Sequence, residues 1–129
     1  MNGLHLTADL AGCAHGDLLT DGSGLARAIR SAAEGAGLSV VGEHWHRFPD
    51  APDGQPGGIT GMLLLAESHV ALHTWPEIGS VTLDVYVCNY GGDNSAKARA
   101  LMATMVALFA PADAREHTLV RGRLGAEAL

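Results

Sequence analysis

Hydrophobic residues recur at every second position in several stretches of the chain, which is the spacing of a β-strand with one buried face. The pattern predicts strands at residues 4–10, 38–48, 59–66 and 81–87, and a weaker one at 116–121. The strand at 81–87 divides most clearly between its two faces. One face carries Val81, Leu83, Val85 and Val87, and the other carries Thr82, Asp84, Tyr86 and Cys88.

Two other stretches have the three- and four-residue spacing of an amphipathic helix. The first covers residues 25–36, with Ser23 as the expected N-cap and Gly37 as the terminator. The second follows Asn94 and is stopped by Pro111. Its apolar stripe consists of Ala98, Leu101, Met102, Met105, Leu108 and Phe109.

The predicted element order is therefore β-α-β-β-β-α-β, within one domain that covers residues 1–129. We expect an α+β fold, a two-layer sandwich in which two helices cover one face of a mainly antiparallel sheet. Gly-rich residues 16–24 end the first predicted strand, and Pro/Gly-rich residues 49–58 are a predicted loop. The other face of the sheet, with Thr82, Asp84 and Tyr86, is semi-polar enough to pack against a partner subunit.

Composition and charge exclude some function classes. The net charge is −6, from 8 basic and 14 acidic residues, so we expect neither nucleic acid nor an anionic membrane as a partner. The N-terminus lacks a secretory signal, and no apolar run approaches the ~20 residues of a membrane span. We therefore expect a cytoplasmic protein in which Cys13 and Cys88 stay reduced.

The most informative segment is Leu65–Glu77, which reads LAESHVALHTWPE. A Glu-Ser bond ends an apolar strand, and His69, His73 and a Thr-Trp-Pro-Glu turn follow. This arrangement suits a serine that attacks its own backbone. Since Ser68 and His73 are five positions apart, an uninterrupted strand would point them to opposite sides, and we expect a bend or bulge near Ser68.

The segment resembles the small prokaryotic S-adenosylmethionine decarboxylases, which make their own pyruvoyl cofactor by self-cleavage before a serine. Further blocks carry the resemblance, in family order, over residues 3–121. They are Gly3-Leu4-His5-Leu6 with Asp9 and Gly12-Cys13, His46-Arg47-Phe48, Ile59-Thr60-Gly61, and Leu83-Asp84-Val85-Tyr86-Val87-Cys88.

The resemblance implies a zymogen that is cut between Glu67 and Ser68 into residues 1–67 and 68–129. Ser68 would become the pyruvoyl group, which forms a Schiff base with the substrate. The single lysine, Lys97, lies on the polar face of the predicted second helix, and no phosphate-binding loop is present. We therefore expect no pyridoxal phosphate, and we expect no metal cofactor.

Residue roles follow from the same resemblance. His73 would accept a proton during processing, and Thr60, where the family has a serine, would assist the acyl shift. Cys88 would be the catalytic proton donor, while Cys13 is expected to be a buried hydrophobe. Phe48 would stack on the adenine and Glu77 would bind the ribose of S-adenosylmethionine. The product would feed spermidine synthesis, and the enzyme would be a sheet-to-sheet homodimer.

Other functions stay open. Members of the family decarboxylate ornithine or arginine, whose terminal cation would need a carboxylate, and four candidates are Asp9, Glu43, Glu77 and Asp84. A metal site is conceivable from His44-x-His46 with His69, His73 and acidic residues elsewhere. A third alternative is a non-enzymatic dimeric binding module with an inert Ser68.

Overall fold

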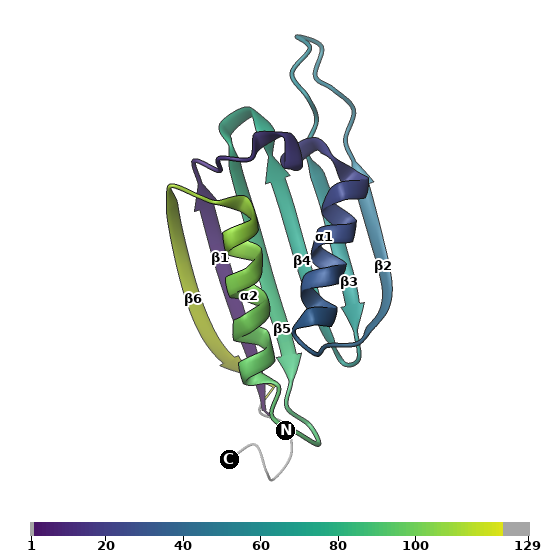
Figure 1. Cartoon of the computed structure of the whole chain (residues 1–129), viewed down its shortest axis with the longest axis vertical. Coiled ribbons are helices and arrows are strands. Elements are labelled where there is room, and N and C mark those ends of the chain that lie inside the picture. Colours follow the sequence, from purple (N-terminus) through teal and green to yellow (C-terminus); the bar gives the residue numbers. More distant parts are fainter. Residues whose placement is uncertain (1, 123–129) are drawn as a thin grey trace.

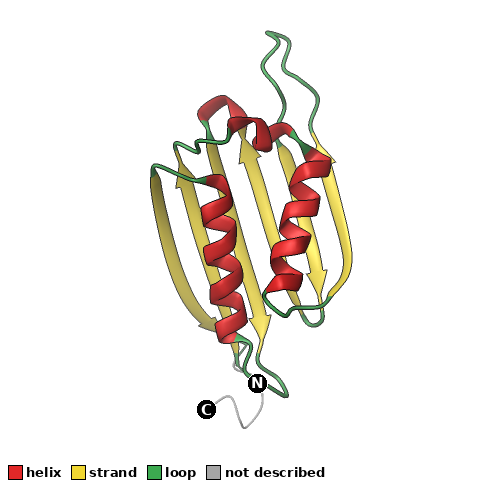
Figure 2. Ribbon diagram, viewed as in Figure 1, coloured by secondary structure: helices red, strands yellow, loops and turns green. Residues whose placement is uncertain are grey.

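The computed structural model describes residues 2–122, in which six strands form one sheet in the order β2-β3-β4-β5-β1-β6. All five pairings between neighbouring strands are antiparallel. Both helices cover the same face of this sheet (Figure 1, Figure 2), which confirms the predicted α+β sandwich. The elements are β1 (Gly3–Ala11), η1 (Gly16–Thr20), α1 (Gly22–Gly35), β2 (Val40–Arg47), β3 (Ile59–Leu65), β4 (Ser68–Trp75), η2 (Pro76–Ile78), β5 (Ser80–Cys88), α2 (Ser95–Phe109) and β6 (Asp113–Arg121).

The hydrophobic core lies between the helices and the sheet. Alternate residues of the central strands point to the helices and are buried, as the two-residue period requires. The helices contribute the apolar stripes that their spacing predicted. The largest fully buried side chains are Phe109, Leu19, Leu25, Ile29, Ile59, Leu63, Leu72, Leu101, Met105, Val70, Val81 and Val85.

The start of α1 differs from the sequence prediction. Asp21, rather than Ser23, is the N-cap, and its carboxylate accepts a hydrogen bond from the Gly24 N–H at 3.0 Å. Ser23 lies inside the first turn. The predicted terminator is confirmed: Gly37 has a φ of +89°, and its N–H donates to the Glu34 carbonyl at 3.0 Å.

The structure has one strand more than the sequence predicted, β4. The alternation in β4 is weak because its less buried side is formed by His69, Ala71 and His73 among others, a mixture that is neither clearly apolar nor clearly polar. The sequence pattern of this segment therefore does not predict a strand. β4 pairs with β3 and β5, so it lies at the centre of the sheet.

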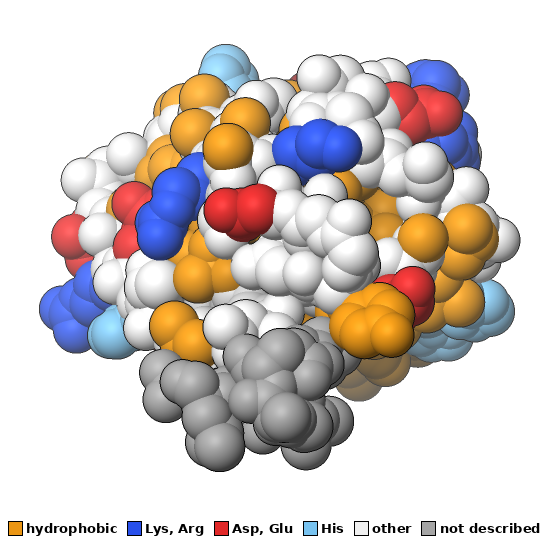
Figure 3. Space-filling model, turned by 90° about the horizontal axis from the view of Figure 1, so that it is seen from below, with side chains coloured by type: hydrophobic (Ala, Val, Ile, Leu, Met, Phe, Trp, Pro, Cys, Tyr) orange, Lys and Arg blue, Asp and Glu red, His pale blue; other side chains and the backbone are white. Residues whose placement is uncertain are grey.

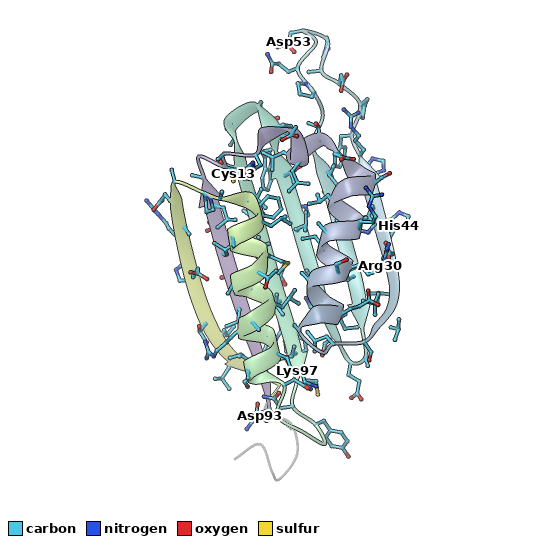
Figure 4. The ribbon with its side chains drawn as sticks, in the orientation of Figure 1. Cys13, Arg30, His44, Asp53, Asp93 and Lys97 are labelled. Carbon is cyan, nitrogen blue, oxygen red and sulfur yellow. The ribbon has the colours of Figure 1, made fainter. Side chains whose placement is uncertain are left out.

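The surface of the described residues has mixed charge at the end seen in Figure 3, where acidic and basic side chains are interspersed. No helix among residues 2–122 has the length and apolar character needed to cross a bilayer. At the opposite end of the molecule, the Pro/Gly-rich loop between β2 and β3 projects from the sheet, with Asp53 at its tip (Figure 4).

Thr74 is the buried polar side chain that joins the sheet to η1. Its hydroxyl donates to the Leu19 carbonyl at 2.7 Å and accepts from the Ile59 N–H at 2.8 Å, and only 4% of the residue is exposed. An isosteric Val would leave both backbone groups without this partner.

We predict that Thr74→Val lowers the free energy of unfolding by about 1–3 kcal/mol, because buried backbone groups lose their hydrogen bonds. Urea denaturation measures the change, with Thr118→Val on exposed β6 as the matched control. Equal stabilities of the two variants would contradict the role assigned to Thr74.

Candidate active site on the open sheet face

The side of the sheet opposite the helices, called the open face below, carries six of the seven histidines. Residues that pair directly across neighbouring strands point to the same side of a sheet. The strand register therefore places these histidines on the same side as the half-buried residues of β1 and β5. They are His5, His44, His46, His69, His73 and His117. Groups able to transfer protons at neutral pH are therefore concentrated on one surface.

The Glu67–Ser68 bond lies at the tight turn between β3 and β4. Leu65 pairs directly with Ser68, so Ala66 and Glu67 alone make the turn. Glu67 has a φ of +56°, the left-handed region that side chains other than Gly adopt only at a cost of about 1–3 kcal/mol. Backbone strain is thus located at the bond that the sequence marked for cleavage.

Ser68 lies beside Cys88. The Ser68 Oγ accepts a hydrogen bond from the Cys88 N–H at 3.1 Å. Cys88 is 6% exposed, and its Sγ accepts from the Tyr90 N–H at 3.4 Å. The predicted pyruvoyl precursor and the predicted proton donor are therefore neighbours across β4 and β5. Cys13 is elsewhere, after β1 (Figure 4), and burial raises the pKa of its thiol.

Thr60 and His73 form a second group further along the open face. The Thr60 Oγ1 and the His73 Nδ1 are 2.9 Å apart and hydrogen bonded. They line a pocket of about 350 Å³ together with Phe48, Trp75 and Glu77. The two residues predicted to help processing and the two predicted to bind substrate are thus brought together.

The two groups do not meet within one chain. β4 pairs with β3 without a register shift from Ser68 to His73, so the predicted bend or bulge near Ser68 is absent from this strand. At ~3.3 Å per residue, five residues separate the two positions by about 16 Å. The alternation also directs Ser68 to the side of Val70, and His73 to the open face.

Three of the four candidate carboxylates for an ornithine or arginine side chain have defined surroundings. Glu43 pairs with Arg30 of α1, on the helix side; the hydrogen bonds from Arg30 lower its pKa. Asp84 is bonded to two histidines. Asp9 lines a second pocket of about 290 Å³ that also includes His73. The structure therefore removes Glu43 from that set of candidates.

The histidines proposed for the alternative metal site are spread out. His44 and His46 lie on the edge strand β2 (Figure 4 labels His44), where they pair with Met62 and Thr60. Among the described residues, one group of three potential ligands converges: His5, His69 and Asp84, with ligand atoms within 4.8 Å of each other. Sequence reasoning did not find this group, because its members come from three strands.

Comparisons with known proteins show which family the chain belongs to. A sequence model described as S-adenosylmethionine decarboxylase matches residues 4–122. The chain belongs to the S-adenosylmethionine decarboxylase family. An S-adenosylmethionine decarboxylase proenzyme from Aquifex aeolicus is 40% identical over 99 residues, covering 77% of this chain. A proenzyme of the same name from Archaeoglobus fulgidus is 34% identical over 120 residues, covering 93%.

The fold of this family member is also similar to a solved structure. The crystal structure of the adenosylmethionine decarboxylase from Aquifex aeolicus superposes with a TM-score of 0.81 at 33% identity, covering 96% of this chain and 93% of that one. Coverage of the relatives' sequences differs: the match spans 66% of the Aquifex protein, slightly less than two thirds, and 97% of the Archaeoglobus protein.

The strain at Glu67 gives a testable prediction. In a Ser68→Ala background, we predict that Glu67→Gly is about 1 kcal/mol more stable than Glu67→Ala, because Gly adopts a positive φ without steric cost. Chemical denaturation of the two double variants measures the difference. If Glu67→Gly were no more stable than Glu67→Ala, the turn would not be strained.

Proposed function

We propose that this chain is a self-cleaving, pyruvoyl-dependent S-adenosylmethionine decarboxylase that acts in the cytoplasm and supplies spermidine synthesis. The observation that carries the proposal is the Glu67–Ser68 bond of this family member. It lies at a turn with a left-handed residue, and the Ser68 hydroxyl is held beside Cys88. Because the chain belongs to the S-adenosylmethionine decarboxylase family, we interpret this bond as the site of self-cleavage.

Self-cleavage would begin when the Ser68 Oγ attacks the Glu67 carbonyl carbon. A C–O bond forms, the C–N bond breaks, and the hydroxyl proton passes to the released nitrogen, so an ester replaces the amide. Removal of the Ser68 α-proton then expels Glu67 as a carboxylate and leaves dehydroalanine. Hydrolysis releases ammonia and gives the pyruvoyl group at residue 68, with fragments 1–67 and 68–129.

His73 and Thr60 are the residues we propose for the proton transfers of cleavage. The hydrogen bond between them fixes the His73 ring through Nδ1 and leaves Nε2 available as a base. A histidine oriented by a hydroxyl is a suitable general base near neutral pH. Thr60 would also assist the acyl shift, as the family serine at its position does.

A second copy of the chain would complete the site. Ser68 and His73 of one chain are about 16 Å apart along β4, too far for direct proton transfer. The open face also exposes large apolar side chains: Met62, Leu64, Trp75 and Leu119 are between 38% and 58% exposed. Face-to-face pairing of two sheets would bury these side chains and bring His73 of one copy toward the Glu67–Ser68 backbone at the start of β4 in the other.

The pyruvoyl ketone, once formed, would bind the substrate amine and accept the electron pair released with CO2. Cys88 is the proton donor that we propose for the substrate carbon. It is buried next to Ser68, and a protonated thiol is a weak acid suited to that transfer. Protonation at the wrong carbon would convert residue 68 to alanine and end activity.

For the substrate, the pocket of Phe48, Trp75 and Glu77 supports S-adenosylmethionine. Its aromatic rings can stack on an adenine and face a sulfonium, and its carboxylate can accept hydrogen bonds from ribose hydroxyls. Asp9, beside His73 in the neighbouring pocket, keeps ornithine or arginine as the alternative. Release of CO2 from each of the three compounds, offered separately, decides between them; activity on ornithine or arginine alone would overturn the choice of S-adenosylmethionine.

Ser68→Ala tests self-cleavage. We predict that the native chain separates into fragments 1–67 and 68–129, with a carbonyl at residue 68 that borohydride reduces. The Ser68→Ala chain stays whole because it lacks the attacking hydroxyl. Intact-mass spectrometry gives the result, and Ser80→Ala, at the start of β5, is the control that should still cleave. A whole native chain after days of incubation would contradict the proposal.

Cys88→Ala tests the proton donor. We predict that CO2 release per mature chain falls about a hundredfold, the scale of general acid catalysis. The fraction of chains carrying alanine at residue 68 should rise with each turnover, as measured by mass spectrometry. Cys13→Ala is the matched control and should retain turnover. Unchanged rates in Cys88→Ala would remove Cys88 from its role.

A further inference from the structure

A chain of polar contacts crosses the open face next to Ser68 and is not part of the chemistry above. Asp84 Oδ2 lies 2.8 Å from His5 Nε2 and 3.1 Å from His69 Nε2. The three side chains belong to β5, β1 and β4, which are adjacent in the sheet. Between 16% and 31% of each side chain is exposed, so the contacts are partly shielded from water.

Arg121, the last residue of β6, extends this chain of contacts. Its Nη1 lies 3.0 Å from His5 Nδ1, and its guanidinium carbon lies 4.9 Å from the centre of the Tyr86 ring. Tyr86 in turn packs against Gly3, where an added Cβ would come within 2.6 Å of its hydroxyl oxygen. The aromatic ring is thus held in place, and it holds the guanidinium against His5.

The contacts have only one consistent assignment of protons. A guanidinium can only donate, so His5 Nδ1 accepts, and the His5 proton is on Nε2 and is donated to Asp84. His69 also donates from Nε2 to the same carboxylate. The Nε2 of His5 carries a proton and is then not free to bind a metal ion, although His5, His69 and Asp84 have a suitable ligand set. The geometry favours a hydrogen-bonded relay over a metal centre.

The relay ends beside the proposed cleavage bond. His69 directly follows Ser68, and its backbone pairs with Leu64 on one side and Tyr86 on the other. The hydrogen bond between its side chain and Asp84 limits backbone motion of β4 at the residue that follows Ser68. Glu67, on the other side, is held in a left-handed turn. Attack of the Ser68 Oγ on the Glu67 carbonyl needs the two atoms about 3–3.5 Å apart, so restricted motion on both sides favours it.

We propose that Arg121 is a positioning residue for self-cleavage, which acts through His5 and Asp84 to fix His69 beside Ser68. The inference rests on the proposed function, because it assigns Arg121 a task in the cleavage of the Glu67–Ser68 bond. Arg121 itself touches none of the atoms that react. Its contribution is to orient His5, and hence the carboxylate to which His69 is bonded.

The first experiment measures the cleavage rate of newly made chains in a pulse-labelled cell-free translation. Arg121→Gln should cleave at least roughly tenfold more slowly than the native chain, the effect of losing one charged hydrogen bond. Arg121→Lys, which still donates to Nδ1, should recover part of the rate. Arg115→Gln, on the same strand with an exposed side chain, is the control and should cleave normally.

The second experiment detects the hydrogen-bonded relay in protein that does not cleave. In uncut Ser68→Ala protein, side-chain ¹H–¹⁵N NMR should show His5 with its proton on Nε2 and an unprotonated Nδ1. Adding Arg121→Gln should abolish this single tautomer, and Arg121→Lys should keep it. A proton on His5 Nδ1 in the Ser68→Ala protein would overturn the relay, whether or not the native chain cleaves.

The outcomes separate the two proposals. Native cleavage with an unchanged rate in Arg121→Gln would overturn the role of Arg121 and leave the proposed function standing. Absence of cleavage in the native chain would overturn the proposed function, and the NMR result would still decide whether the relay exists. Slow cleavage in Arg121→Gln, with recovery in Arg121→Lys, supports the inference.

Discussion

Packing of both helices on the same side of the sheet is the constraint on which the rest of the structure depends. Alternate residues of every strand point to opposite sides, so each central strand supplies one set of apolar side chains to the core and a second set to the open face. The core side makes the domain stable. The open face is then available for histidines and acids, which a core could not hold without partners.

Much of the fold could be predicted from the sequence, because its periodicities are local. The alternation in β5, the helical stripe of α2 and the Gly37 terminator each depend on a few neighbouring residues, and the structure confirms them. The strand β4 could not be predicted from the sequence because its less buried side mixes His, Ala and Trp, which gives no clear alternation of apolar and polar residues. The N-cap prediction was wrong because Asp21 and Ser23 are both good caps, and sequence alone does not say which one turns toward the first free N–H.

The candidate site could be predicted only in part. A family motif names residues, and the structure brings Ser68 to Cys88 and Thr60 to His73 as neighbours on adjacent strands. Their separation into two groups depends on the uninterrupted register of β4, which no motif encodes. The contact between Arg121 and His5 joins residues 116 positions apart, and only the pairing of β1 with β6 brings them together.

The central claim is that Ser68 of one chain is completed by His73 of a second copy, and complementation tests it most directly. Ser68→Ala and His73→Ala chains, each inactive alone, are co-expressed and examined by intact-mass spectrometry. With random pairing into two-fold dimers, about half of the His73→Ala chains should appear as fragments 1–67 and 68–129. Whole chains throughout the mixture, under conditions in which the native protein cleaves, would contradict the account.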